Sequence, residues 1–385
     1  MNRPLYQKKQ TEMLTAYLFV SPAILLISIF GLVPVFYALW VSLNKWRISR
    51  RGFIGLSNYE QIFGDYTNLV LVFIAGLCLC LAGIIRSKFS KKPSQIIRIL
   101  VISAAIILFI LALPRIASSG DERMLQSLQV TIFYALGSVP IQIIGGLSLA
   151  IALNQKIYGK QFFRMVFLLP YIVPTVAAAS VFEVLFSLRP ESFANQIIKQ
   201  LGFSELQWLG EPRGIFEMLF RFGSVSNEVS SNIISYWLQW ASGPSLALVS
   251  IMFFNYWVFI GYYALIYTNG LAQIDRQLFE AASIDGAKPW TVIRKILIPL
   301  LSPTTFFLTM IGIMGTFKAF NHIYILRNLS TRGATDPMSV YIFFTFVRRQ
   351  RLDQASTIAI VLFLLVLGIT IYHRQNREKR IEYGQ

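Results

Sequence analysis

Long apolar stretches dominate the chain and alternate with shorter segments that carry charge. Eight stretches of at least 16 residues contain no Asp, Glu, Lys or Arg. They are residues 13–44, 66–85, 99–114, 124–155, 165–182, 229–274, 296–317 and 354–373. Because a helix needs about 20 mainly apolar residues to cross a bilayer, each stretch is a candidate span. The pattern therefore predicts an all-α, polytopic membrane protein with about eight transmembrane helices, with seven or nine as the alternatives.

The first and sixth stretches are longer than one span requires. The first predicts a transmembrane helix over 14–43, which is far too long for the apolar core of a signal peptide, so we interpret it as an uncleaved anchor. The sixth is long enough for two spans, but Gly243 and Pro244 interrupt it. We expect one span over 244–268, preceded by an amphipathic helix outside the membrane.

Composition agrees with a membrane protein. Of the 385 residues, 55% are hydrophobic and only 14% are charged, whereas soluble domains carry about 25% charged residues. The formal net charge of +17 could indicate nucleic acid, but basic residues scattered between apolar spans fit loop anchoring better, and we expect no nucleic-acid partner. Cys78 and Cys80 lack metal-site spacing, and with two histidines no metal site is expected.

Alternation of sides along the chain places the charged segments. If residues 1–13 are a cytoplasmic N-terminus, then the loop 271–299 and the basic tail 373–385 are also cytoplasmic. Basic residues are about twice as dense in the segments assigned to that side, as the positive-inside rule requires. We interpret the tail as an anchor for anionic membrane lipid. Five arginines depart from the rule because they fall in outside segments: Arg50, Arg51, Arg348, Arg349 and Arg351.

Residues 68–113 form an apolar hairpin that adds two spans and leaves the sidedness of later spans unchanged. We interpret it as an inserted transmembrane hairpin, accessory to a transmembrane core over 124–372. The largest outside loop is 188–243, in which Trp208, Trp237 and Trp240 are candidates for interfacial anchors.

The polar segment Glu280–Pro299 lies between two apolar spans and predicts a short helix, a turn and a second helix. Asp275 is placed to cap the first helix. Gly286 follows Asp285 where a helix end requires a left-handed residue. Pro289 suits the first position of the second helix, and Pro299 ends or kinks that helix.

The spacing of this segment is Glu280-Ala281-Ala282, three residues, Gly286, nine residues, then Ile-x-Ile-Pro ending at Pro299. It resembles the EAA loop of ABC-importer permease subunits, a cytoplasmic loop whose first helix docks on an ATPase subunit. Ile298 is a departure, since the family usually has Leu before the final proline. The resemblance implies that the ATPase-coupling residues are Glu280, Ala281, Ala282, Asp285, Gly286 and Pro299.

Further motifs resemble the carbohydrate-uptake branch of this family, the maltose-type first permease. They include Ser21-Pro22, Gly55-Leu56-Ser57-Asn58-Tyr59, Phe162-Phe163-Arg164, Leu169-Pro170, Trp208-Leu209 and Ile323-Tyr324. The similarity covers roughly 14–67 and 125–372, which is a six-helix core without the hairpin 68–113. Part of 211–243 looks inserted, and the Gly-Gly-Pro turn common in the family is replaced near 330–337.

The resemblance implies one half of a pore in the bacterial cytoplasmic (inner) membrane. The expected partners are a second permease subunit, two ATPase subunits and an extracytoplasmic solute-binding protein. ATP and Mg²⁺ would bind the partner ATPase and no cofactor would bind this chain. The expected cargo is a sugar, an oligosaccharide or a sugar-derived polyol or osmolyte, such as a glucosylglycerol- or trehalose-like solute.

Rival functions have weaker support in the sequence. An ion-coupled secondary transporter would need charged or broken-helix ion sites at the midplane, and only Lys318 qualifies. A membrane-embedded glycosyltransferase would need an acidic pair, whereas Glu183, Glu191, Glu205 and Glu211 share no fixed spacing. The sequence lacks a Gly-rich phosphate loop, and we expect no catalytic residues.

We expect the substrate pathway to be lined by two spans. On 244–268, Tyr256, Tyr263 and Tyr267 lie on one helical face, and Asn255 with Tyr262 forms an adjacent polar stripe. On the following span, Gly315, Lys318 and His322 share a face, with Asn321 at its edge. Aromatic rings stack on sugar C–H surfaces, and Asn and Tyr hydrogen-bond to hydroxyls. The alternative is that these stripes pack span against span.

Overall fold

The computed structural model describes residues 5–72, 74–76, 78, 92–155, 157–220, 233–331 and 333–381. Within these ranges, five helical segments are long and apolar enough to cross a membrane. They are Glu12–Ser42 (most of α1 with α2), Ile99–Ser119 (in α5), Glu122–Asn154 (α6), Leu246–Ala272 (α12) and Leu352–His373 (in α19). The predicted all-α membrane fold is confirmed, although nine of the 20 residues of the expected span 66–85 lie outside the described residues.

Two further spans are bent pairs of helices and would bring the count to seven. The first joins α7 (Lys160–Ile172) to α8 (Thr175–Leu185) at 94°, and Pro174 lies at the break. The second joins the segment Pro289–Leu300 to α16 (Ser302–Phe317) at 66°. Proline lacks the N–H that continues a helix, so Pro174 gives the first break a local cause.

The other elements are short helices that connect the spans, together with α1, α2, α5 and α19, which contain spans. Their bounds are α1 Leu5–Ile27, η1 Ser28–Leu32, α2 Val33–Ser42, α3 Ser57–Phe63, α5 Lys92–Ser119, α9 Phe193–Gln200, α10 Ile215–Phe220, α11 Ile233–Ala241, α13 Arg276–Ile284, α14 Pro289–Val292, η2 Ile293–Leu297, α15 Ile298–Leu300, α17 Asn321–Leu326, η3 Leu329–Thr331, α18 Met338–Val347 and α19 Leu352–Ile381. The amphipathic helix expected before the span 244–268 is α11.

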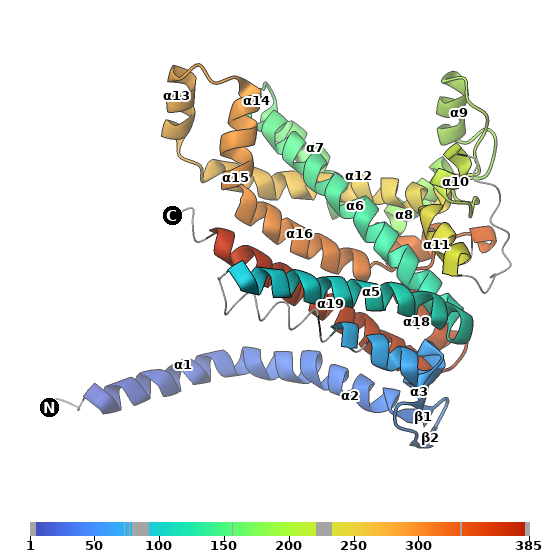
Figure 1. Ribbon diagram of the computed structural model, residues 1–385. Coiled ribbons are helices and arrows are strands. Elements are labelled where there is room, and N and C mark those ends of the chain that lie inside the picture. Colours follow the sequence, from blue (N-terminus) through green and yellow to red (C-terminus); the bar gives the residue numbers. More distant parts are fainter. Residues whose placement is uncertain are drawn as a thin grey trace.

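No β structure was predicted, yet β1 (Asn44–Trp46) and β2 (Arg50–Phe53) form an antiparallel hairpin after α2. The chain termini and α13 lie at one end of the molecule, on the left of Figure 1. The hairpin, α9, α10, α11 and α18 lie at the opposite end. This arrangement agrees with an even number of crossings between the first and last segments.

Helices α6 and α12 cross closely at the centre of the fold, because small residues allow the contact. A Cβ placed on Gly146 of α6 would lie 2.5 Å from the Cβ of Tyr263 on α12. The hydroxyl of Tyr256 donates a hydrogen bond to the Gly137 carbonyl across the same crossing, at 3.1 Å. Small residues and hydrogen bonds are the main sources of helix association in membranes.

The hairpin insert was expected to end at residue 113 and the core to begin at 124, but α5 continues through Pro114 to Ser119 and α6 begins at Glu122. Leu113 and Ile116 are buried there against residues of α6 and α19. The second arm of the predicted hairpin insert is therefore packed into the core.

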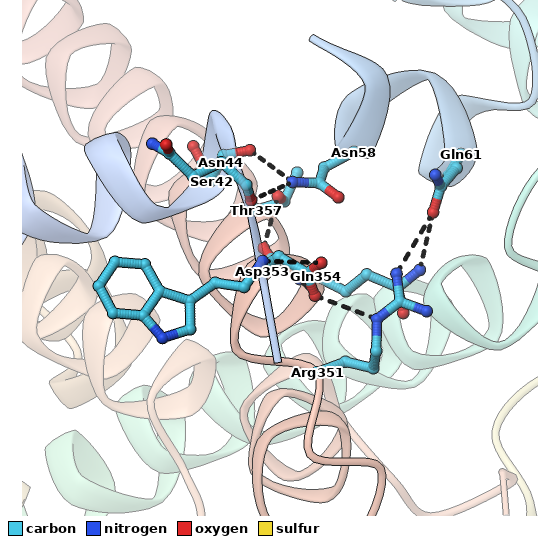
Figure 2. Close-up of polar contacts among 9 residues, drawn as sticks. Ser42, Asn44, Asn58, Gln61, Arg351, Asp353, Gln354 and Thr357 are labelled. Atoms are coloured by element: carbon cyan, nitrogen blue, oxygen red, sulfur yellow. Dashed lines mark hydrogen bonds and ion pairs between the residues drawn. The ribbon is translucent and has the colours of Figure 1, made fainter. Parts of the chain in front are cut away.

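The N-terminal arm, which comprises α1 and α2, stands apart from the other spans in Figure 1. Only 6% of the residues in its most apolar stretch are buried, although α2 packs on α19. Polar contacts fix its far end (Figure 2). The buried Asp353 carboxylate accepts hydrogen bonds from the Trp46 backbone at 3.4 Å and from Arg351 at 3.1 Å. Asn58 donates to the carbonyls of Ser42 and Asn44 at 2.8 and 3.2 Å.

We predict that Asp353→Ala loosens the N-terminal arm. Asp353 is 1% exposed, and its loss leaves buried donors without an acceptor, which costs about 2 kcal/mol of unfolding free energy. The check is equilibrium unfolding of the purified protein, together with proteolysis of the arm. Glu191→Ala, at an exposed carboxylate of the same end of the molecule, is the control. Equal stability of the two variants would contradict the assignment.

Candidate coupling loop and translocation face

The segment between α12 and α16 forms the predicted helix, turn and second helix. The Asp275 carboxylate accepts a hydrogen bond from the backbone N–H of Gln277 at 3.0 Å and caps α13. Pro289 lies in the first turn of α14. The segment lies at the same end of the molecule as the start of α1 and the end of α19 in Figure 1.

A Schellman turn closes α13. The N–H of Gly286 donates to the Ser283 carbonyl at 3.1 Å, and the N–H of Ala287 donates to the Ala282 carbonyl at 2.9 Å. Gly286 has φ = +65° and open space around its Cβ position, so backbone conformation rather than crowding requires glycine. The Asp285-Gly286 turn predicted from the sequence is confirmed.

One face of α13 is exposed and the other is attached to the core. Glu280, Ala281 and Asp285 are exposed, whereas Ala282 is buried. Apolar side chains join the exposed face: Ile284 is 87% exposed, Trp290 of α14 is 69% exposed and Leu278 is 44% exposed. On the other face, Phe279 packs against the core cluster that contains Tyr263, Tyr267, Leu301 and Leu308.

Pro299 lies where the second helix changes its winding. The preceding turn, η2, is a π-helix that ends at Leu297, and the 66° bend follows within three residues of Pro299. In the N-terminal arm, η1 is likewise a π-helix and ends at Leu32, two residues before Pro34. Because proline cannot donate to the carbonyl four residues earlier, the backbone widens before it.

The predicted tyrosine stripe of α12 packs against neighbouring helices. The Tyr263 hydroxyl donates to the Leu308 carbonyl at 3.2 Å, and the Tyr267 hydroxyl donates to Thr305 Oγ1 at 3.0 Å. Tyr256 of α12 is half-buried against α6. These contacts match the span-packing alternative within this chain. The place of the tyrosines in a pathway stays a prediction.

Of the two residues in the second predicted stripe, Asn255 is buried and Tyr262 is half-buried. Asn255 is 3% exposed, and its carbonyl accepts a hydrogen bond from Gln142 at 3.5 Å. Tyr262 is half-buried and stacks on Tyr171 of α7, with ring centroids 4.5 Å apart. Tyr262 therefore brings the bent span α7–α8 next to α12.

The expectation that Gly315, Lys318 and His322 share one helical face is wrong. Helix α16 ends at Phe317 and α17 begins at Asn321, so the face is interrupted. Lys318 and Asn321 are exposed, whereas His322 is buried and its Nε2 lies 2.6 Å from the Tyr134 hydroxyl on α6. The Phe254 ring also stacks on His322, at 5.3 Å.

Sequence reasoning missed the bend between α7 and α8. The signal was present, because Pro170 and Pro174 lie four residues apart within one apolar stretch. Several side chains along the bent pair are exposed and apolar: Phe162, Met165, Leu169, Ile172, Val176, Val181 and Val184. Within the described residues, no cluster of three metal-ligating side chains occurs.

Comparison with known proteins identifies the family. A model described as "Binding-protein-dependent transport system inner membrane component" matches residues 142–376, which is more than half of the chain. The chain belongs to this family. The resemblance to ABC-importer permeases inferred from the EAA spacing is thereby confirmed.

Permeases similar to this chain match it over about nine-tenths of their length. The probable ABC transporter permease protein YurN of Bacillus subtilis is 24% identical, and the match covers 92% of this chain and 93% of the relative. The trehalose/maltose transport system permease protein MalF of Thermococcus litoralis is also 24% identical, with 95% and 94% covered. The lactose transport system permease protein LacF of Rhizobium radiobacter is 26% identical, with 91% and 89% covered.

Solved structures share the fold of this inner membrane component. A bacterial ABC transporter involved in the import of the acidic polysaccharide alginate superposes with a TM-score of 0.61 at 17% identity, and covers 97% of this chain and 99% of that one. A bacterial alginate ABC transporter in complex with an alginate pentasaccharide-bound periplasmic protein superposes with a TM-score of 0.58 at 16% identity, with 100% and 99% covered.

We predict that Gly286→Val impairs transport without preventing folding. Valine at positive φ costs about 1 kcal/mol or more locally and opens the Schellman turn. Gly202→Val is the matched control, because Gly202 has φ = +82° and an open Cβ position at the opposite end of the molecule. Solute uptake at equal membrane levels is the measurement. Full uptake by Gly286→Val, or equal loss in both variants, would refute the role of the turn.

Proposed function

We propose that this chain is a membrane-spanning permease subunit that forms half of the pore of an ATP-driven, binding-protein-dependent importer. The observation that carries the proposal is the α13–α14 loop, with its exposed Glu280, Ile284 and Trp290. An exposed carboxylate beside apolar side chains suits a cleft in another protein, with a basic group that pairs with Glu280. The family model covers this loop and supports the proposal.

The loop would transmit motion because its attachment is rigid. Ile274 and Phe279 on one side and Ile293 on the other pack against the same core cluster, which joins α12 to α16. Rigid-body movement of α13 in an ATPase cleft would therefore move both helices together. Closure of the ATPase subunits would switch the pore between inward- and outward-facing states.

The proposed cargo is a sugar, an oligosaccharide or a sugar-derived polyol. The names of relatives that transport trehalose, maltose and lactose support this class. In this chain, the exposed Lys318 and Asn321 lie at the break where α16 ends and α17 begins, and Tyr171 of α7 stacks on Tyr262 of α12. Such groups offer hydrogen bonds and ring faces to a hydroxylated solute.

The proposed assembly contains a second permease subunit, two ATPase subunits that bind ATP and Mg²⁺, and an extracytoplasmic solute-binding protein. The alginate transporter in complex with its periplasmic protein supports the last partner. We propose that both termini are cytoplasmic, because they lie at the same end as α13 in Figure 1. The second permease would cover the exposed apolar side chains of α7 and α8.

Co-purification tests the proposed coupling. The double variant Glu280→Ala/Ile284→Ala removes an exposed carboxylate and an 87% exposed side chain from α13. We expect the amount of ATPase subunit retained by the tagged chain to fall about tenfold, as for an interface hot spot.

Glu191→Ala/Leu201→Ala is the matched control, because it removes an exposed carboxylate and a 65% exposed leucine at the α9 end of the molecule. Retention of the ATPase by both double variants would exclude α13 as the contact. Absence of any ATPase from the wild-type preparation would refute the proposed function itself.

A second prediction separates pathway contacts from packing contacts. Asn321→Ala removes an exposed amide and should reduce the apparent affinity for the solute about fivefold, through one lost hydrogen bond. Tyr263→Phe removes a buried bond to the Leu308 carbonyl and should lower stability by about 1 kcal/mol while apparent affinity stays unchanged. Concentration dependence of uptake is measured at matched expression. The assignment of Asn321 fails if its variant transports like the wild type.

A further inference from the structure

The hairpin β1–β2 concentrates positive charge at the end of the molecule opposite α13 (Figure 1). Four exposed basic side chains occur within seven residues: Lys45, Arg47, Arg50 and Arg51. Among the described residues, none of the four forms an ion pair. The sequence has no acidic residue between Glu12 and Glu60. The hairpin therefore carries charge that this chain does not neutralise.

The basic residues nearby are different, because partners in the chain engage two of them. Arg351 pairs with the buried Asp353 at 3.1 Å. Arg349 donates to the Tyr341 hydroxyl at 3.0 Å and lies over the Tyr341 ring. These contacts account for two of the five arginines that depart from the positive-inside rule. Arg50 also has partners within the chain, but its hydrogen bond uses Nε and not a terminal nitrogen.

Arg50 is held in a fixed orientation. Its guanidinium lies over the Trp40 ring, 4.7 Å from the centroid, and its Nε donates to Asn44 Oδ1 at 3.1 Å. Asn44 is itself fully buried, and its Nδ2 donates to the Trp40 carbonyl at 2.6 Å. The two terminal nitrogens of Arg50 have no hydrogen-bond partner in the described part of the chain. A planar guanidinium with both amino groups free matches the oxygens of a phosphate.

The surroundings of Arg50 are those of a membrane interface. Tyr37, Trp40 and Trp46 form an aromatic cluster, with ring centroids 5.4 to 6.2 Å apart. The cluster lies at the end of α2, whose apolar side chains are exposed, and Trp and Tyr concentrate at the level of lipid headgroups. Ile48 and Phe53 of the same hairpin are 85% and 69% exposed. Apolar side chains beside arginines suit insertion among headgroups.

We propose that the hairpin β1–β2 binds the headgroup of an anionic phospholipid, with Arg50 in contact with the phosphate and Arg51, Arg47 and Lys45 adding attraction. The lipid is favoured over a protein partner because the site continues the exposed apolar surface of α2. The headgroup site does not depend on the transport function. We assign it to the outer leaflet, and only that assignment rests on the proposed function.

Lipid titration of the full-length protein, purified with its co-purifying subunits, tests the site. Bound phosphatidylglycerol and phosphatidylcholine are counted by native mass spectrometry. We expect Arg50→Gln/Arg51→Gln to lower the affinity for phosphatidylglycerol about tenfold and to leave phosphatidylcholine binding unchanged. High salt should reduce the difference between wild type and variant. Arg50→Lys, which keeps the charge but loses the planar fork, should give an intermediate affinity.

Lys199→Gln/Arg213→Gln is the matched control, because both side chains lie at the same end but are paired within the chain. Lys199 lies 2.7 Å from Glu205, and Arg213 lies 2.8 Å from Glu211, where its hydrogen bonds lower the pKa of that carboxyl. Equal phosphatidylglycerol affinity in the hairpin and control variants would overturn the proposal.

Two further outcomes separate this proposal from others. Unchanged lipid binding, combined with lost stimulation of ATP hydrolysis by the solute-binding protein in phosphatidylcholine vesicles, would make the hairpin a protein docking site and overturn the lipid site. Labelling of Ser49→Cys by an impermeant reagent reports the leaflet, and we expect labelling from outside. Labelling from the cytoplasm would overturn the sidedness of the proposed function while the headgroup comparison still holds.

Discussion

The close crossing of α6 and α12 is the contact on which the other helices depend. Within a bilayer, burial of apolar surface gives helices little reason to associate, so close backbone approach and hydrogen bonds must hold them. Gly146 lets the backbone of α12 reach α6. From there, Tyr263 and Tyr267 attach α16 through the Leu308 carbonyl and Thr305. The stack of Tyr262 on Tyr171 attaches α7.

The packed unit of α6, α12 and α16 holds both ends of the proposed coupling loop, residues 271–299. The loop leaves α12 near Asp275 and returns to α16 through the bend after Pro299. Because the tyrosine hydroxyls tie α12 to α16, both ends of the loop belong to one packed unit. The Schellman turn at Gly286 closes α13 with two backbone hydrogen bonds. Under the proposed function, a force on α13 would therefore be passed to both helices.

The features that the sequence predicted are those with local causes. The cap at Asp275, the turn at Gly286 and the helix start at Pro289 depend on neighbouring residues alone, and the length of the apolar stretches determines the spans. The hairpin after α2 was missed because one of its fixing contacts comes from Asp353, 307 positions from Trp46 in the sequence. The burial of His322 likewise depends on Tyr134, 188 positions away. No local pattern contains this information.

The interruption between α16 and α17 limits where this part of the chain lies. It occurs without proline or glycine at Lys318, Ala319 and Phe320, and it leaves backbone groups outside the helical ladder. The Ser339 hydroxyl of α18 donates a hydrogen bond to the Ala319 carbonyl and satisfies one of them. Irregular backbone is tolerated at membrane depth only where it contacts protein or water, since lipid offers no hydrogen bonds. This constraint supports placing the exposed Lys318 and Asn321 on a hydrated path or a subunit contact. A continuous apolar helix would impose no such requirement, so the break carries more weight for the pathway than the tyrosine stripe does.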